Sequence, residues 1–268
     1  MFAGELDILE CRLATMAPYD VHHIILESVT DNHGRPKETA FHENSSRYRE
    51  YLPRVSFLKV PAMPGPGAWE REHQLRDCAM SFLYEYAVGG DSVLVADVDE
   101  IPAPWLLETP RTGMLMMRNM MLTIDRALPD LQPTSVMVQW PFTGSLSGIR
   151  DARGVLPHLE PGGWHLSWLG GEEAVQRKLA MHCHTEGELA EKVSRLVPND
   201  DMPPWCREHA PAAWFSSPVL LPVSVLPSGR AAHSAPASRI ARAPRQHHIA
   251  VPSRVPASRQ KRFARCPG

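Results

Sequence analysis

Two aspartates separated by one residue, Asp97 and Asp99, are the side chains of this sequence best suited to chemistry. They follow directly on the apolar run 93–96, which is typical of a strand buried on both faces of a parallel sheet. In open α/β sheets ligands bind beyond the carboxyl ends of strands, so the pair is expected at a ligand site. In an extended segment the two carboxylates would point the same way, with Val98 turned toward the core.

Two neighbouring carboxylates repel each other unless a cation lies between them. A hard divalent cation, Mn²⁺ or Mg²⁺, held partly by carboxylates and partly by substrate phosphates would meet that need. The alternative is an acidic loop that caps the following segment, because Asp-x-Asp alone often occurs by chance. The buried strand before the pair and Glu100-Ile101-Pro102 after it favour the metal site. Pro102 and Pro104 are expected to end the strand ladder.

The elements that must position this pair alternate between helices and strands. Apolar residues at helical spacing predict one helix near the N-terminus, over residues 5–16, and a longer one over 69–86 that Gly89-Gly90 would end. Strand, helix and strand in succession argue for an α/β layered fold. Further strands and a last helix complete the prediction: strands at 21–26, 55–60, 93–96 and near 114–118, 134–140, 164–168 and 178–183, and a helix at 186–196.

Four blocks of sequence, taken in order, carry a resemblance to a known family. The first is Glu5-Leu6-Asp7-Ile8-Leu9-Glu10-Cys11-Arg12-Leu13, continued by Ile25-Leu26-Glu27-Ser28 and Gly34-Arg35-Pro36-Lys37. The second is Trp69-Glu70-Arg71-Glu72-His73-Gln74-Leu75-Arg76, and the third runs from Ser92 to Pro102. The fourth is Gly162-Gly163-Trp164-His165-Leu166-Ser167-Trp168, followed by Lys178-Leu179 and His184-Thr185-Glu186. Over about residues 4–195, these blocks resemble glycosyltransferase family 17.

The best-known members of that family are β-1,4-mannosyl-glycoprotein 4-β-N-acetylglucosaminyltransferases, which add the bisecting GlcNAc of N-glycans. The resemblance implies a GT-A-like (Rossmann-like) nucleotide-sugar-binding domain with a mixed, mostly parallel sheet. It also implies a UDP-GlcNAc donor, a glycan acceptor, a divalent metal and inversion at the anomeric carbon. The sequence departs from the family at Gly4, where the family has Asn, and lacks most of the short strand that usually precedes the first block.

The candidate metal ligands are Asp99, Asp97 and His184. Asp99 is the expected direct ligand, and Asp97 is either a second ligand or a contact to the ribose. His184 is the candidate third ligand because the resemblance includes a late His-x-Glu. A core or surface histidine is the alternative for His184. His182, two residues earlier, would share its face of an expected strand.

An inverting transfer needs a base that removes the proton of the attacking acceptor hydroxyl. The catalytic candidates are three carboxylates, Glu186, Glu172 and Glu173. Glu186 has another explanation, since a carboxylate in the first turn of a helix complements the helix dipole. Glu172 and Glu173 follow Gly170-Gly171, a flexible approach to a site.

Two arginines and one glutamate are candidates for nucleotide binding. Arg71 and Arg76 could bind the diphosphate, because arginine contacts phosphate oxygens bidentately. For Arg76 the alternative is an exposed i,i+4 ion pair with Glu72. Glu27 ends an expected strand and could face the nucleoside.

The charge of the chain is unevenly distributed. Of its 28 basic residues nine follow Glu208, where no acidic residue occurs, so residues 1–208 carry 19 basic against 30 acidic groups. An acidic body does not suggest a nucleic-acid binder. We expect a glycosyltransferase domain over 1–208, short of its first strand, and a basic disordered tail rich in Pro, Ser, Arg and Ala over 209–268.

The remaining features concern the setting of the protein. The sequence has no apolar stretch long enough to span a membrane and no signal-peptide features in its first residues. Its five cysteines are scattered and form no CxxC pair, so a disulfide framework or zinc cluster is not expected. A reducing cytoplasm is the simplest setting.

Several functions are compatible with these motifs. Transfer of GlcNAc from UDP-GlcNAc to a glycan is the leading hypothesis, and a same-fold transferase with another donor sugar is the nearest alternative. A metal-dependent phosphohydrolase would need a wider cluster of ligands than the sequence offers. A non-catalytic glycan-binding relative would not need both aspartates. Trp164 and Trp168 could form a platform for a sugar ring, although large apolar residues on one strand face are often core residues.

Overall fold

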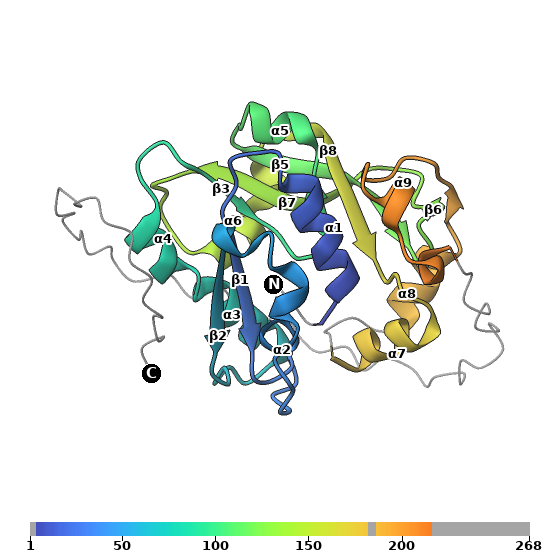
Figure 1. Ribbon diagram of the computed structural model, residues 1–268, viewed down its shortest axis with the longest axis horizontal. Coiled ribbons are helices and arrows are strands. Elements are labelled where there is room, and N and C mark those ends of the chain that lie inside the picture. Colours follow the sequence, from blue (N-terminus) through green and yellow to red (C-terminus); the bar gives the residue numbers. More distant parts are fainter. Residues whose placement is uncertain (1–3, 182–185, 216–268) are drawn as a thin grey trace, which may run out of the picture. The chain divides into compact units, whose positions relative to one another are not determined.

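The computed structural model describes residues 4–181 and 186–215, without the side chains of residues 172–173, 181 and 186–188. Helices and strands alternate along the first half of this part, and longer strands follow (Figure 1). The α-helices are α1 (Leu6–Met16), α2 (Ala40–Glu43), α3 (Ala68–Asp77), α4 (Met80–Tyr86), α5 (Pro104–Glu108), α6 (Leu146–Asp151), α7 (Glu172–Met181), α8 (Glu186–Val193) and α9 (Cys206–His209). Short 3₁₀ turns occupy Ser45–Tyr48, Leu52–Arg54, Ala152–Val155 and Ala212–Trp214.

The strands form two sheets. They are β1 (His23–Ser28), β2 (Val55–Val60), β3 (Ser92–Val95), β4 (Glu100–Pro102), β5 (Gly113–Met121), β6 (Arg126–Ala127), β7 (Gln132–Gln139), β8 (His158–Ser167) and β9 (Val197–Pro198). The smaller sheet contains β1 and β2, which are parallel. In the larger sheet β3, β7, β5, β6 and β9 follow one another, β8 lies along the other edge of β5, and β4 pairs with β8.

The expected α/β class with a mixed sheet is confirmed, but the expected predominance of parallel pairs is wrong. Among the described strands only β1 with β2 and β5 with β8 are parallel, and every other pair is antiparallel. The strand that leads to Asp97, β3, pairs antiparallel with β7. Of its four residues only Val95 is buried. The expectation that this strand is buried on both faces is therefore wrong as well. An apolar run indicates a strand, whereas its burial and the direction of its neighbour depend on residues far away in the sequence.

Most of the local predictions hold, with two corrections. The helix expected over 69–86 divides into α3 and α4 at residues 78–79, where Ala79 and Phe82 donate to carbonyls three residues back. The strand expected near 178–183 is wrong, because residues 172–181 form α7. Val175 and Leu179 lie four residues apart and pack into the same core cluster, as one face of a helix requires.

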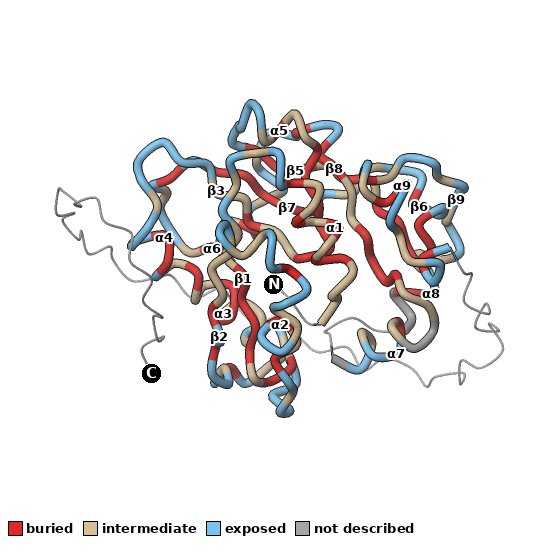
Figure 2. Tube along the Cα trace, in the orientation of Figure 1, coloured by how far each residue is buried: buried red, intermediate tan, exposed pale blue. Residues whose placement is uncertain are grey.

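The core follows the long strands and the faces of the helices that cover them (Figure 2). One cluster joins β1 and β2 to α3, α4 and the end of β3, with Leu58, Phe82 and Val95 among its members. Another lies under α1 and includes Leu166 of β8 and Trp214, which is only 2% exposed. The packed part of the described chain therefore extends past residue 208. No helix in residues 4–181 or 186–215 is long and apolar enough to cross a membrane.

Candidate active site

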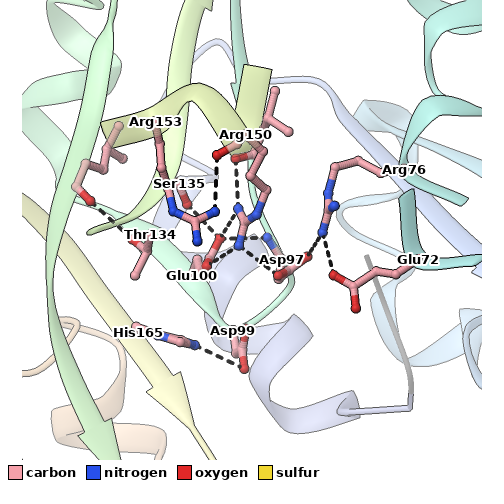
Figure 3. Close-up of polar contacts among 12 residues, drawn as sticks. Glu72, Arg76, Asp97, Asp99, Glu100, Thr134, Ser135, Arg150, Arg153 and His165 are labelled. Carbon is pink, nitrogen blue, oxygen red and sulfur yellow. Dashed lines mark hydrogen bonds and ion pairs between the residues drawn. The ribbon is translucent and has the colours of Figure 1, made fainter. Parts of the chain in front are cut away.

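Asp97 and Asp99 lie on a turn that connects β3 to β4. The turn is closed by a hydrogen bond from the backbone N–H of Glu100 to the carbonyl of Asp97, 3.1 Å long. The extended geometry expected for the pair is therefore wrong, and the chain resumes pairing at Glu100 instead of leaving the sheet. Val98 points into the core as expected and is 7% exposed. The two carboxylates consequently meet different partners (Figure 3).

Glu100, which is 2% exposed, holds this turn from inside. Its Oε2 accepts hydrogen bonds from the backbone N–H of Asp97, from the Ser135 hydroxyl and from Arg150 Nη1, each 2.8 Å long. Its Oε1 lies 2.6 Å from Arg150 Nη2. The same guanidinium reaches Asp97 Oδ2 at 2.9 Å and the carbonyl of Val95 at 3.2 Å. Arg150 of α6 thus fastens the end of β3 to the acidic turn.

Two further arginines reach the turn from other helices. Arg12 of α1 donates to the carbonyls of Asp97 and Glu100. Arg76 of α3 pairs with Glu72 at 3.0 Å and lies 3.5 Å from Asp97 Oδ1. The alternative considered for Arg76, an ion pair with Glu72, is present, but it is buried rather than exposed and it extends to Asp97.

Asp99 faces α7 and β8. Lys178 Nζ lies 2.7 Å from its Oδ2, and His165 Nε2 lies 3.5 Å from the same oxygen. Lys178 also lies 3.8 Å from Glu5 and 5.6 Å from the centre of the Trp168 ring. The Asp99 side chain is 6% exposed, so its negative charge is balanced by the protein itself.

The cations around the turn keep its carboxylates ionised. Burial alone would raise the pKa of Asp97, but Arg150 and Arg76 outweigh it and hold that pKa far below its usual range. Burial is likewise outweighed at Asp99, where Lys178 and His165 lower the pKa. Burial disfavours the His165 imidazolium, yet the charge of Asp99 raises the pKa of His165 above its ordinary value.

A cavity of about 310 Å³ opens beside Lys178. Its wall includes the first turn of α1, Trp168, Lys178 and Arg177, together with Arg47 and Trp214. Among the described residues the exposed guanidinium of Arg177 has no hydrogen-bond or ion-pair partner. The cavity therefore combines a helix N-terminus and the side chains of Arg177 and Lys178 with the acidic residues Glu5 and Asp7, and Lys178 connects it to Asp99.

Three of the residues predicted for nucleotide or sugar binding make contacts elsewhere. Glu27 is fully buried and accepts hydrogen bonds from the N–H groups of Ala40 (2.8 Å) and Phe41 (3.0 Å), which fixes the start of α2. Arg71 donates to the carbonyl of Asn32 at 2.9 Å. Trp164 donates from Nε1 to Asp201 at 2.9 Å. Each of these side chains thus has a structural partner in addition to any role in binding.

Several predicted residues fall outside the described part of the chain. His184 and its neighbour His182 belong to the segment 182–185. The backbone of Glu172, Glu173 and Glu186 begins α7 and α8, but these three side chains are outside the description.

No role was predicted from the sequence for four residues that contact the turn: Arg12, Arg150, His165 and Lys178. Arg12, His165 and Lys178 lie within or beside the blocks that carry the family resemblance, which was a usable signal. Arg150 lies in none of those blocks, and it reaches Glu100 across 50 residues of sequence. Nothing local in the sequence indicates that contact.

Comparison with known proteins decides the family. The model of the family described as Glycosyltransferase family 17 matches residues 1–184, which is more than half of the chain. The chain belongs to glycosyltransferase family 17. No curated protein and no solved structure matches it. As a member of this family the protein is a glycosyltransferase, with a sugar donor and a glycan acceptor as substrates. The acidic turn, His165 and Lys178 all lie within the matched residues.

The oxygen atoms around the turn allow a test of whether a divalent metal would fit. Among the described side chains, no group of three His, Cys, Asp or Glu residues could hold a metal ion by itself. Both oxygens of the Asp97 carboxylate face arginines, whereas the ion pairs of the Asp99 carboxylate with described residues use Oδ2. A metal bound together with a diphosphate commonly takes one or two carboxylates from the protein and its other ligands from phosphates and water. Asp99, with Asp97 beside it, supplies that number of carboxylates.

Proposed function

We propose that this protein transfers GlcNAc from UDP-GlcNAc to a glycan acceptor, with inversion at the anomeric carbon, on a GT-A-like domain. The observation that carries the proposal is the cluster of ionised groups on the turn after β3. Asp97, Asp99 and Glu100 are met there by cations from α1, α3, α6 and α7. Such a concentration of buried charge is expensive for a fold and is typical of functional sites.

The diphosphate and sugar of the donor would bind in the cavity beside Lys178. Arg177 and Lys178 supply positive charge to the phosphates, and the N-terminus of α1 adds N–H groups with a favourable dipole. Lys178 contacts Asp99 as well, so it connects this cavity to the acidic turn. A bound phosphate would draw Lys178 away from Asp99 and leave that carboxylate available to a cation.

Mn²⁺ or Mg²⁺ would be held by Asp99, with Asp97 beside it, and when bound it would offset the negative charge that develops on the departing diphosphate. Lys178 and Arg177, which line the cavity, act on the same charge. A carboxylate among Glu172, Glu173 and Glu186 would accept the proton of the acceptor hydroxyl. That oxygen forms the new bond to the anomeric carbon as the bond to the diphosphate oxygen breaks, and UDP leaves.

A transfer assay tests this proposal. The protein is incubated with UDP-GlcNAc, Mn²⁺ and a panel of mannose- and GlcNAc-terminated oligosaccharides. The masses of the products are then measured by mass spectrometry. We expect one acceptor to gain a single N-acetylhexosamine, and Asp99→Asn to abolish the gain. Asp125→Asn is the matched control, because Asp125 lies outside the acidic turn.

Other outcomes of the assay would contradict the proposal in different ways. Transfer from UDP-galactose or GDP-mannose, with none from UDP-GlcNAc, would identify a different donor sugar. Glycan binding without transfer from any nucleotide sugar would point to a non-catalytic relative. Transfer that proceeds at the same rate in EDTA would contradict the proposed metal dependence but would still support UDP-GlcNAc as the donor.

A further inference from the structure

Two cysteines from opposite ends of the described chain meet in the core beneath α1. Cys11 lies in the middle of α1, and Cys206 begins α9, 195 residues later. Their exposed fractions are 0% and 1%, and their Sγ atoms are 3.2 Å apart. Both belong to the cluster that contains Leu166 and Trp214. The spacing of the cysteines in the sequence gave no indication of this contact.

The two sulfur atoms are close enough to be joined with little movement. Their separation is only about 1 Å longer than the S–S bond of a disulfide, so small side-chain rotations would bring them to bonding distance. Cys78, the other cysteine among the described residues, is not part of this cluster. Proximity thus singles out one pair.

The pair would connect the candidate active site to a segment beyond the family match. Helix α1 carries Arg12, which binds the carbonyls of the acidic turn, and the family match ends at residue 184. The later segment is held to the core by Trp214, whose carbonyl accepts from the N–H of Ile124 at 2.8 Å. Trp205 packs against the same cluster as Cys11. A bond between Cys11 and Cys206 would fix this segment to the helix that supports the turn.

We propose that Cys11 and Cys206 form an intramolecular disulfide when the protein equilibrates with an oxidised low-molecular-weight disulfide such as glutathione disulfide. The thiolate of one cysteine attacks glutathione disulfide and releases one glutathione as its thiolate. The second cysteine then gives up its proton and attacks the mixed disulfide, which releases the other glutathione. Two protein thiols are oxidised to one S–S bond, and one glutathione disulfide is reduced to two thiols.

Burial controls when this exchange takes place. Burial, followed by the contact with Cys206, raises the pKa of the Cys11 thiol above its ordinary value, so the reactive thiolate is scarce in the closed protein. Exchange therefore proceeds during folding or when the segment that carries α9 opens locally. The expected signature is slow oxidation of the native protein and fast oxidation during refolding.

Peptide mapping of the full chain provides the test. The protein is refolded from denaturant in glutathione disulfide, remaining thiols are alkylated, and non-reduced tryptic peptides are identified by mass spectrometry. We expect the peptides of Cys11 and Cys206 to be joined as the main species, and the melting temperature to rise by about 5 °C or more over the reduced protein. Cys78→Ser should leave both results unchanged, whereas Cys206→Ala should remove both.

Two results would overturn the proposal. One is that Cys11 and Cys206 are both alkylated after refolding under oxidising conditions. The other is that Cys11 is joined mainly to a different cysteine. Neither result depends on the proposed transferase reaction, because the linkage is read from the peptides and not from activity.

Discussion

The acidic turn illustrates at the residue scale how one arginine can hold several carboxylates. Arg150 is 8% exposed and bonds Glu100, Asp97 and the carbonyl of Val95 through one guanidinium. A planar fork of donors suits this arrangement, and a lysine could satisfy only part of it. Removing such a residue leaves its partners as buried charges without compensation, and that penalty exceeds the value of the contact itself.

We predict that Arg150→Ala lowers the free energy of unfolding by about 3–5 kcal/mol, because Glu100 remains buried and loses its main cation. Arg150→Lys should lose less, since one ammonium retains part of the attraction. Urea unfolding at neutral pH measures both effects. Arg195→Ala, at an exposed position, is the control and should change stability by no more than about 0.5 kcal/mol. A loss below 1 kcal/mol for Arg150→Ala would show that Glu100 is not held as described.

At the scale of elements, the close approach of β4 to β8 brings the acidic turn next to His165. Gly163 of β8 pairs with Pro102 of β4 and has a φ of +123°. A Cβ atom at this position would lie 2.1 Å from the carbonyl oxygen of Ile101, which is backbone and cannot move aside. The pairing of these strands therefore requires glycine for both space and conformation.

We predict that Gly163→Ala separates β4 from β8 and destabilises the protein by at least about 2 kcal/mol. Gly154→Ala is the matched control, because a Cβ there meets nothing within 4 Å and no positive φ is involved. Thermal unfolding of the two variants should separate them clearly. Equal melting temperatures would mean that the paired strands β4 and β8 tolerate a side chain at position 163.

A partly buried histidine at the start of β1, His23, makes the fold sensitive to acid. Burial and, secondarily, the positive charge of Arg12 lower the pKa of His23 from 6.5 to about 3. The unfolded chain then binds a proton that the folded chain resists, so stability is lost as pH falls from about 6.5 toward 3. Between pH 7 and pH 5 this loss amounts to about 2 kcal/mol.

We predict that His23→Gln reduces the loss of stability between pH 7 and pH 5 by about 2 kcal/mol relative to the natural sequence. Urea unfolding of both proteins at the two pH values measures the difference. The same pH dependence in both would show that His23 takes up its proton without unfolding. The comparison is made within each protein, so any direct effect of the substitution at pH 7 cancels.

Helices and strands that follow from the apolar pattern of their own residues could be predicted from the sequence. Helix α1 and strand β2 follow from local apolar spacing, and Asp97 and Asp99 could be found because they follow β3 directly. The direction of β3 could not be predicted, since it depends on β7 some 40 residues later. The same holds for Arg150, whose role exists only through tertiary contacts. Local sequence therefore indicated the acids of the site but only part of the cations that hold them.

For the molecule as a whole, the important boundary is where packing ends. From the sequence, the folded domain was predicted to end at residue 208. Trp214 is nevertheless only 2% exposed and packs in the cluster beneath α1. Asn199 and Asp201 of the same segment bond Ile124 and Trp164. The segment after the family match thus contributes to the core that supports the site.

We predict that a variant ending at residue 215 keeps the stability of the whole chain, because residues 216–268 have the composition of a segment without a core. A variant ending at residue 208 should lose about 3–5 kcal/mol, since it lacks the buried Trp214. Chemical unfolding compares the three lengths. Equal stability of the two shorter variants would show that residues 209–215 do not pack on the core.

In the proposed function, the turn after β3 is part of a metal-dependent nucleotide-sugar site. Isothermal titration of UDP-GlcNAc, with and without Mn²⁺, tests it most directly when the natural sequence is compared with Asp99→Asn. We expect binding that requires Mn²⁺ and is lost in the variant, while the variant keeps its cooperative thermal unfolding. Binding of equal affinity in both proteins, or no binding to the natural sequence in either condition, would contradict it.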